Sequence, residues 1–155
     1  MIKQFNDISL LAHNTFGIKV NAAHFVDFCS VNELTDFLGS GFKGKSLVIG
    51  GGSNLLFVND FNGTVFHSSI QSVEIVEECA TDILLRVGSG LNWDRFVEYT
   101  VEKGWCGLEN LSLIPGEVGA SAVQNVGAYG VEAGDLIEKV ETIRIADAVA
   151  CTFTK

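Results

Sequence analysis

A run of three glycines is the first part of the sequence that could bind a ligand, through its main-chain N–H groups. The segment VIGGGSNLLF, residues 48–57, places three consecutive glycines (50–52) between a short apolar run and the pair Ser53 and Asn54. Each glycine costs about 0.5–1 kcal/mol of extra ordering relative to alanine. Such a run indicates either a very tight turn or a loop that something approaches closely. Without Cβ atoms, successive N–H groups can converge on an anion, and the Ser53 hydroxyl and Asn54 amide are further donors.

Two nucleotide-binding patterns resemble this part of the chain, but neither fits it fully. Residues 39–46, GSGFKGKS, match the Walker A pattern letter for letter, but a predicted helix precedes them and a predicted strand follows, the reverse of a P-loop. The glycine run begins like the dinucleotide fingerprint G-x-G-x-x-G, but Leu55 occupies the third glycine position and no amphipathic helix follows. We therefore interpret Lys43 and Lys45 as solvated loop residues. Residues 50–54 are predicted to form an anion nest or, alternatively, a tight turn without a ligand.

The cysteines and histidines are scattered along the chain. The cysteines form no C-x-x-C pair and no histidine lies at ligand spacing, so the sequence predicts neither a zinc site nor a disulfide framework. We expect buried thiols, isolated histidines without a chemical role, and no metal site. The cysteines are Cys29, Cys79, Cys106 and Cys151, and the histidines are His13, His24 and His67.

Composition excludes several classes of protein. The 155 residues are 47% apolar, which is enough for one domain or two small subdomains with a real core. A net charge of −9 repels phosphate backbones and anionic lipid, so we expect no nucleic-acid partner and no membrane partner. The first residues lack the apolar stretch of a secretory signal, and no segment approaches the roughly 20 apolar residues that cross a bilayer. We expect a cytoplasmic protein.

The elements that must position the glycine run form a predicted β-α-β unit. Strands are expected at residues 24–29 and 47–49, with a short helix between Val31 and Leu38, and an Asn62-Gly63 turn is expected before the next strand. The clearest later helix spans residues 93–103, with Asn92 as N-cap and Gly104 at its end. Further strands are expected at residues 64–68, 72–76, 83–87, 139–145 and 150–155.

A second glycine-rich segment carries a specific resemblance. GLENLSLIPGEVGASAVQNVGAYG, residues 107–130, has too many turn-forming residues for ordinary core and too much apolar content for a disordered linker. Together with NTFG at 14–17 and GGGSN at 50–54, it resembles the amino-terminal half of the UDP-N-acetylenolpyruvoylglucosamine reductase family. The three motifs occur in family order, and the resemblance runs from about Asn14 to Ile145.

This resemblance implies an α+β fold, the FAD-binding module of the vanillyl-alcohol oxidase and xanthine dehydrogenase type. Two subdomains grip FAD in that module. The first is expected at about residues 1–70 and the second, incomplete, at about residues 71–155, with the substrate-binding domain absent. We expect an unpaired sheet edge in the incomplete subdomain, which would invite self-association.

The resemblance also implies where the cofactor binds. The glycine run is expected along the FAD pyrophosphate, and the second segment is expected to form the opposite wall, with Ser121 as a hydrogen-bond donor. Tyr129 would either contact the cofactor or be a buried structural residue. Structural roles are expected for Asn14 and Thr15 at the amino terminus and for Gln124 and Asn125 at a helix end. The expected FAD-binding residues are Gly50, Gly51, Gly52, Ser53, Asn54, Leu55, Ile114, Pro115, Gly116, Gly119, Ala120, Ser121, Val123 and Tyr129.

In the resembled family, NADPH reduces FAD, and the flavin passes hydride to the enolpyruvyl group of a UDP-sugar in peptidoglycan synthesis. An arginine, a serine and a glutamate assist, and the first two belong to Tyr-Arg-x-Ser and Gly-Ser-Phe-Phe stretches that do not occur here. No catalytic residue is therefore predicted, and we expect the chain alone to be inactive. The alternatives are a stand-alone flavin- or nucleotide-binding module without catalysis and, less favoured by the motifs, a related FAD-dependent oxidase.

Overall fold

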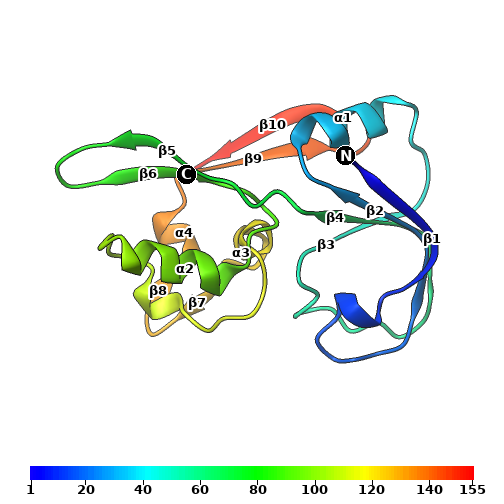
Figure 1. The fold of residues 1–155 in the computed structure, drawn as a ribbon, viewed down its shortest axis with the longest axis horizontal. Helices are drawn as coiled ribbons and strands as arrows, with labels where there is room; N and C mark the ends of the chain where they lie inside the picture. The colour runs from blue at the N-terminus through cyan, green and yellow to red at the C-terminus, as the bar shows by residue number, and fades with distance from the viewer.

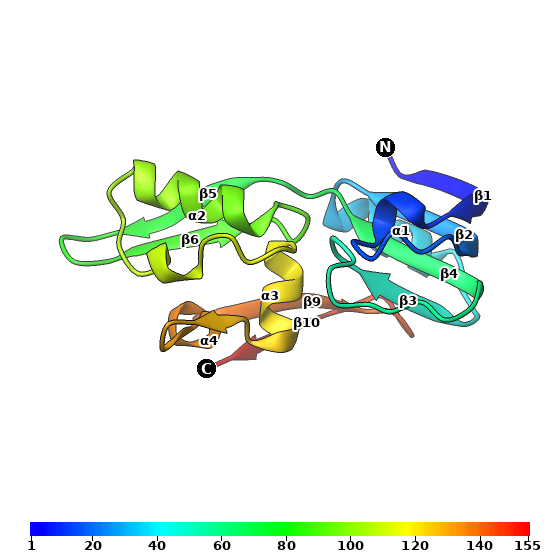
Figure 2. The same cartoon turned by 90° about the horizontal axis from the view of Figure 1, so that it is seen from below.

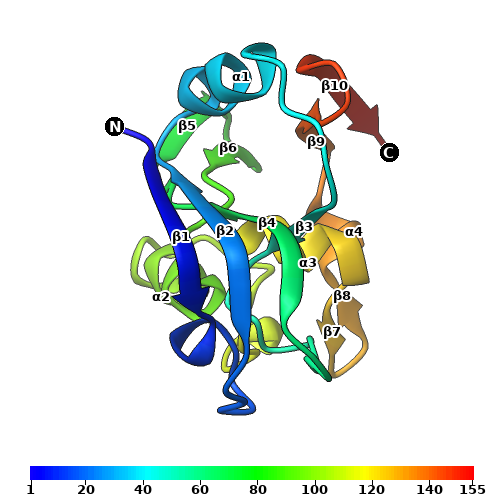
Figure 3. The same ribbon diagram turned by 90° about the vertical axis from the view of Figure 1, so that its right-hand side faces the viewer.

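The computed structural model describes residues 1–155, and its largest sheet has the strand order β1-β2-β4-β3, which Figure 3 shows with the strands seen along their length. β1 (Lys3–Ser9) pairs antiparallel with β2 (Asn21–Phe28). β2 and β3 (Ser46–Ile49) each pair parallel with β4 (Phe61–Ser68). The predicted β-α-β unit is thus confirmed, with β4 lying between its two strands.

Helix α1 (Val31–Gly39) connects β2 to β3 and matches the predicted helix. Ser30 is its N-cap, because the Ser30 hydroxyl accepts a hydrogen bond from the Glu33 amide at 3.2 Å. The Walker A-like residues 39–46 therefore follow a helix and lead into a strand, which confirms the order that is incompatible with a P-loop.

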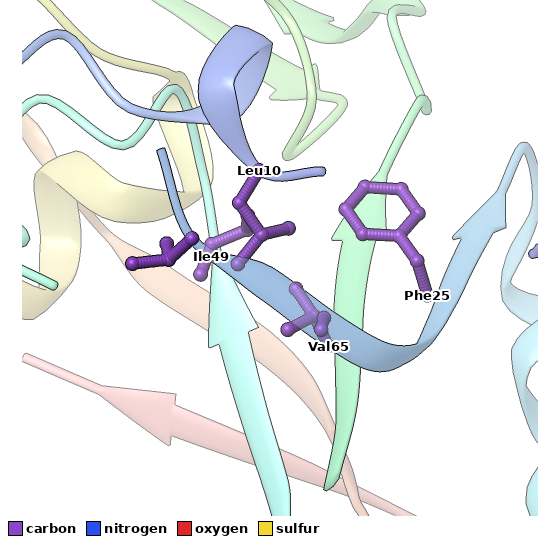
Figure 4. Close-up of a cluster of buried hydrophobic side chains, with 6 residues drawn as sticks. Leu10, Phe25, Ile49 and Val65 are labelled. Atoms are coloured by element: carbon purple, nitrogen blue, oxygen red, sulfur yellow. The ribbon is translucent and has the colours of Figure 1, made fainter. Parts of the chain in front are cut away.

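The two faces of this sheet build two separate cores, because side chains alternate along each strand. Phe25 and Val65 face one core, whereas Val26 and Phe66 face the other. A register irregularity between Ala22 and His24 brings Ala22 to the same core as Phe25, although the two residues are three positions apart and would face opposite sides of a regular strand. Figure 4 shows the first core, whose six buried residues are Leu10, Val20, Ala22, Phe25, Ile49 and Val65.

Two features of the sheet differ from prediction. The Asn62-Gly63 pair is not a turn but lies inside β4. A Cβ added at Gly63 would come within 2.6 Å of the Lys45 carbonyl oxygen, so this glycine permits a close approach of the neighbouring main chain. Strand β1 was not predicted, because nearly all its side chains are exposed and its apolar residues do not alternate.

The second lobe, residues 73–136, is built around helix α2 (Trp93–Glu102) and lies beside the sheet in Figure 1. The Asn92 side chain accepts a hydrogen bond from the Arg95 amide at 3.0 Å, and Gly104 follows the helix with φ +73°, so both predicted boundaries are confirmed. Its buried core consists of Trp93, Phe96, Val97, Leu111 and Ala133. The other elements of this lobe are β5 (Val73–Glu78), β6 (Ile83–Val87), η2 (Glu109–Leu111), α3 (Val118–Gln124), β7 (Gly127–Ala128), β8 (Val131–Glu132) and α4 (Ala133–Leu136).

A terminal hairpin links the lobes. β9 (Lys139–Arg144) and β10 (Val149–Thr154) pair antiparallel and run from beside α4 towards α1 (Figures 1 and 2). Apolar residues of the hairpin, Ile143, Ile145 and Ala148, pack against the core that contains Phe66 and Leu38. Since residues late in the chain cover the first lobe, the division at about residue 70 stays a prediction. No helix in the structure is long and apolar enough to cross a membrane.

The amino-terminal NTFG segment has the predicted structural role. Asn14 is buried, and its side-chain amide donates to the carbonyl oxygens of Leu10 at 2.7 Å and Ile18 at 3.0 Å. The Asn14 side-chain oxygen accepts from the Ile18 amide at 2.9 Å, and the Thr15 amide donates to the Gly52 carbonyl at 3.3 Å. The Asn14 bonds hold the turn after η1 (Leu11–His13), and the Thr15 bond joins this turn to the glycine run.

The expectation of buried thiols is wrong. Cys29, Cys79 and Cys106 are exposed, and Cys151 is half-buried on β10. They occupy loop, hairpin and strand-edge positions, where the packing of the lobes leaves them at the surface. None forms a disulfide.

Candidate functional site

A cleft of about 400 Å³ lies between the two glycine-rich segments. Residues 48–55, at the carboxyl end of β3, form one wall, and residues 114–126, around α3, form the other. Figure 2 shows α3 opposite the loop that follows β3. The fold therefore brings together two segments that lie about sixty residues apart, as the 62-residue separation of Ser53 and Pro115 illustrates.

The structure places every predicted FAD-binding residue except Tyr129 along this cleft. Tyr129 lies in the turn between β7 and β8 with φ +53°, and its side chain is 89% exposed. It neither lines the cleft nor is buried, so the alternative of a buried structural tyrosine is wrong. Asn125 has its predicted helix-end role, because its side-chain oxygen accepts from the Gly134 amide at 2.7 Å. Gln124 instead lines the cleft.

The surrounding structure constrains the three glycines of the first wall to different degrees. Gly52 has φ +65°, and a Cβ added there would come within 2.0 Å of the His13 carbonyl oxygen, so the fold itself requires glycine. A Cβ at Gly50 would lie 3.2 Å from the Ala120 Cβ. Gly51 has no positive φ, and the nearest atom to its added Cβ is the Gly116 Cα at 3.6 Å. Part of the bare backbone is therefore explained by close contacts within the chain, whereas a Cβ at Gly51 would make only ordinary van der Waals contact with Gly116.

The same wall presents main-chain donors without partners. None of the amide N–H groups from Gly51 to Asn54 donates a hydrogen bond to another atom of the chain. The Ser53 hydroxyl donates to the Pro115 carbonyl at 3.0 Å and so joins the two walls directly. Consecutive unpaired N–H groups in a glycine-rich loop are the donor set that binds anions. The geometry therefore leaves the main-chain donors of the predicted nest without partners, whereas the Ser53 hydroxyl hydrogen already has one.

The second wall is held by close packing of α3 against the loop after β6. A Cβ at Gly119 would come within 2.6 Å of the Ser89 Cβ, and the Gly119 amide donates to the Ser89 carbonyl at 2.9 Å. The Ser121 hydroxyl donates to the Val118 carbonyl at 2.7 Å inside α3. The Ser121 hydroxyl hydrogen thus has a partner inside the helix, and the donor role of Ser121 towards a cofactor stays a prediction.

Sequence reasoning missed the residues that reach the cleft from other elements. Ser89 and Ser68 line it, and their hydroxyls are 2.7 Å apart. A signal existed, because Gly88 and Gly90 flank Ser89, and Cβ atoms there would come within 2.3 Å of the Ile70 carbonyl and 2.0 Å of the Ser68 carbonyl. A Gly-Ser-Gly sequence at a strand end indicates such close main-chain contact. The other missed lining residues are Phe28, Val48, Ile49, Trp93, Glu117, Gln124 and Val126.

His67 connects the sheet to the second wall. Its Nδ1 lies 3.0 Å from Asp27 Oδ1 on β2, and its Nε2 lies 3.1 Å from Glu117 Oε1 before α3. The ring of His13 lies 5.8 Å away between centroids, so two histidines that are distant in sequence are neighbours in space. The expectation of isolated histidines is wrong for this pair, because β4 and η1 bring them to the same side of the sheet.

The titration of these groups is coupled. The hydrogen bond to Glu117 raises the pKa of His67, with burial opposing and Asp27 reinforcing the change. Burial alone would raise the pKa of Asp27, but hydrogen bonds from Ser69, at 2.5 Å, and from His67 hold it below its usual range. Burial, reinforced by the charge of His67, lowers the pKa of His13. His67 therefore favours its charged form and His13 its neutral form.

Comparison with known proteins identifies similar chains. A family model described as FAD binding domain matches residues 40–152. UDP-N-acetylenolpyruvoylglucosamine reductase of Bacteroides fragilis strain YCH46 is 61% identical over 138 residues, which are 88% of this chain and 42% of that protein. The reductase of the same name from Amoebophilus asiaticus strain 5a2 is 44% identical over 151 residues, which are 96% of this chain and 44% of that protein. The chain thus spans less than half the length of the curated relatives it matches.

A solved structure has the same fold. The crystal structure of UDP-N-acetylenolpyruvylglucosamine reductase from Thermus caldophilus aligns with a TM-score of 0.74 over 99% of this chain and 52% of that chain, at 23% sequence identity. The alignment includes both lobes and the hairpin that links them. The predicted α+β fold of the FAD-binding module is confirmed.

Replacing Gly52 by alanine should destabilise the fold, whereas replacing Gly51 should not. Gly52→Ala combines a positive φ with a clash against the His13 carbonyl, and strain and overpacking each cost about 1–3 kcal/mol. We expect the free energy of unfolding to fall by roughly 2–4 kcal/mol for Gly52→Ala and to change by less than about 1 kcal/mol for Gly51→Ala. Urea denaturation of both variants measures this difference, and equal losses would contradict the assignment.

The contribution of His67 to stability should depend on pH. Because its pKa is raised on folding, the contribution is complete below the ordinary histidine pKa of about 6.5 and is lost as the pH rises through the raised value. The Asp27 contribution, with a lowered pKa, is present above about 3.9 and is lost as the pH falls through the lowered value. We expect His67→Gln to lower the free energy of unfolding by about 1–3 kcal/mol between about pH 3.9 and about pH 6.5, and by less at higher pH.

The measurement is urea denaturation of wild type and His67→Gln across this pH range. His24→Gln is the matched control, since His24 is exposed on the same sheet and contacts Asn6 rather than a carboxylate. A wild-type-minus-variant difference that stays constant from about pH 5 to about pH 9 would refute the coupling.

Proposed function

Because this chain belongs to the family of FAD binding domains, we propose that the cleft between its two glycine-rich segments binds FAD. The observation that carries the proposal is the set of unpartnered amide N–H groups from Gly51 to Asn54. The diphosphate of FAD offers acceptor oxygens at close spacing, and main-chain donors can bind them without a cationic side chain. This suits a chain whose overall charge is −9.

Each wall has a distinct part in the proposed binding. Residues 50–54 would hold the diphosphate, and no close contact within the chain requires glycine at position 51. On the opposite wall, Ile114, Pro115 and Val123 offer apolar surface to a flat ring system, and Gly116 keeps the space beside them free of a Cβ. Pockets for cofactors typically combine such apolar walls with a few directed polar groups.

We propose further that the chain is the FAD-binding part of a cytoplasmic, NADPH-dependent reductase that acts on UDP-N-acetylenolpyruvoylglucosamine in peptidoglycan synthesis. The support is the name shared by the relatives described above, together with the three motifs in family order. Bound FAD supplies hydride transfer, and the residues of this chain would bind and orient it. Residues 1–155 contain neither the Tyr-Arg-x-Ser nor the Gly-Ser-Phe-Phe stretch, so we expect them to bind the cofactor without turnover.

A charge placed on the cleft wall should weaken FAD binding. Val123 lines the cleft with its side chain 84% exposed, so Val123→Asp adds a carboxylate without disturbing a core. We expect at least about a tenfold loss of affinity, which corresponds to about 1.4 kcal/mol, in calorimetric titration with FAD. Val58→Asp is the control, because Val58 is 79% exposed and lies outside the cleft. Equal effects of the two substitutions, or a colourless wild type that ignores FAD, would overturn the proposal.

The reductase proposal is tested by a chimera. Residues of this chain replace the aligned 138 residues of the Bacteroides fragilis reductase, and oxidation of NADPH is measured with and without UDP-N-acetylenolpyruvoylglucosamine. We expect a yellow protein whose NADPH oxidation depends on the UDP-sugar, because the replaced segment would supply the same cofactor cleft. A chimera that retains FAD but shows no such turnover would contradict this proposal and favour a flavin-binding module of another function.

A further inference from the structure

The geometry around His67 specifies its protonation state. Nδ1 lies 3.0 Å from Asp27 Oδ1, and Nε2 lies 3.1 Å from Glu117 Oε1. Ionised carboxylates only accept hydrogen bonds, and a neutral imidazole has a single N–H to donate. Both contacts are therefore satisfied together only when His67 carries a proton on each nitrogen, as an imidazolium.

The charged and titratable groups that surround His67 come from four elements. Asp27 on β2 and Glu117 before α3 face its two nitrogens, His13 on η1 lies 5.8 Å away between ring centroids, and Lys3 on β1 places Nζ 3.9 Å from Asp27 Oδ2. With His13 neutral, the cations Lys3 and His67 balance the two carboxylates. Removing the proton from His67 leaves one negative charge without a partner.

That unbalanced charge would lie in the proposed cofactor site. Glu117 is the only charged side chain that lines the cleft. A Cβ added at Gly50 would come within 3.3 Å of Glu117 Oε2, so the second carboxylate oxygen lies beside the glycine run. A bare carboxylate at this position would repel an anion bound by the amides of residues 51–54. A cation that neutralises Glu117 would remove this repulsion, and no other lining residue is charged.

We propose that protonated His67 is a positioning residue for cofactor binding, which neutralises and orients Glu117 so that the cleft accepts the diphosphate of FAD. The inference rests on the proposed function. Anion binding and protonation of His67 are thermodynamically linked. If protonation of His67 strengthens anion binding by a given factor, the bound anion strengthens proton binding to His67 by the same factor. A neighbouring charge typically changes the pKa of a side chain by about one to three. We therefore expect protonation of His67 to change the affinity for FAD by at least about tenfold.

A double-mutant cycle tests the proposal by calorimetric titration of the chain with FAD near pH 6.5, the ordinary pKa of histidine. We expect His67→Gln to bind FAD at least about tenfold more weakly than wild type, because Glu117 then lacks its counter-charge. Glu117→Gln should bind at least as tightly as wild type, and the double variant should regain most of the affinity lost in His67→Gln. His24→Gln, on the same sheet but outside the cleft, should bind like wild type. A merely structural role of both residues would instead give losses that add.

The pH profile and the spectrum of His67 give independent readouts. FAD affinity of wild type should fall as the pH rises through the pKa of His67, and the affinity of Glu117→Gln should not. Nitrogen NMR of the ligand-free chain should show the imidazolium form of His67 at neutral pH. FAD binding with additive losses, a flat pH profile or a neutral His67 would overturn this inference and leave the proposed function intact. A wild type that binds no FAD at any pH would overturn both.

Discussion

Close contact between main-chain segments at positions without a Cβ is the constraint on which the rest of this structure depends. Gly52 lies against the His13 carbonyl, Gly90 against the Ser68 carbonyl, and Gly119 against Ser89. Each contact would be closed to any residue with a side chain. Together they determine the path of the loop after β3, the position of the loop after β6 and the position of α3. The cleft is the space that remains between elements held in this way.

The glycine run therefore serves two purposes that a sequence cannot separate. Gly52 is required by the fold, because its φ is positive and its neighbour is main chain. Gly51 has neither constraint, and the amides that follow it have no partners within the chain. A loop held rigidly on one side and unsatisfied on the other is pre-organised to bind acceptor atoms, since little ordering remains to be done when they arrive.

Local arrangement matters more than overall charge at such a site. The chain is strongly acidic, and the only charged side chain on the cleft wall is a carboxylate. Main-chain dipoles act over short distances, whereas the field of distant surface charges is screened by salt. His67, which contacts Glu117, also acts over a short distance. An acidic protein can therefore present a locally favourable site for an anion.

Much of the local structure was determined by the sequence alone. Apolar spacing predicted β2, α1, β3, β6 and α2, and Asn92 and Gly104 marked the ends of α2, because these elements depend on interactions within a few residues. The resemblance carried by the three motifs implied the FAD-binding fold and the two segments that would face each other.

Only the tertiary structure decided which individual residues meet across the cleft. It placed Asn62-Gly63 inside a strand, left Tyr129 at the surface, and joined His67 to Asp27 and Glu117 from three different elements. The first outcome depends on strand pairing, and the contact of His67 with Glu117 depends on the packing of one lobe against the other. Those interactions connect residues that are 40 and 50 positions apart for the two partners of His67, and no local pattern encodes them.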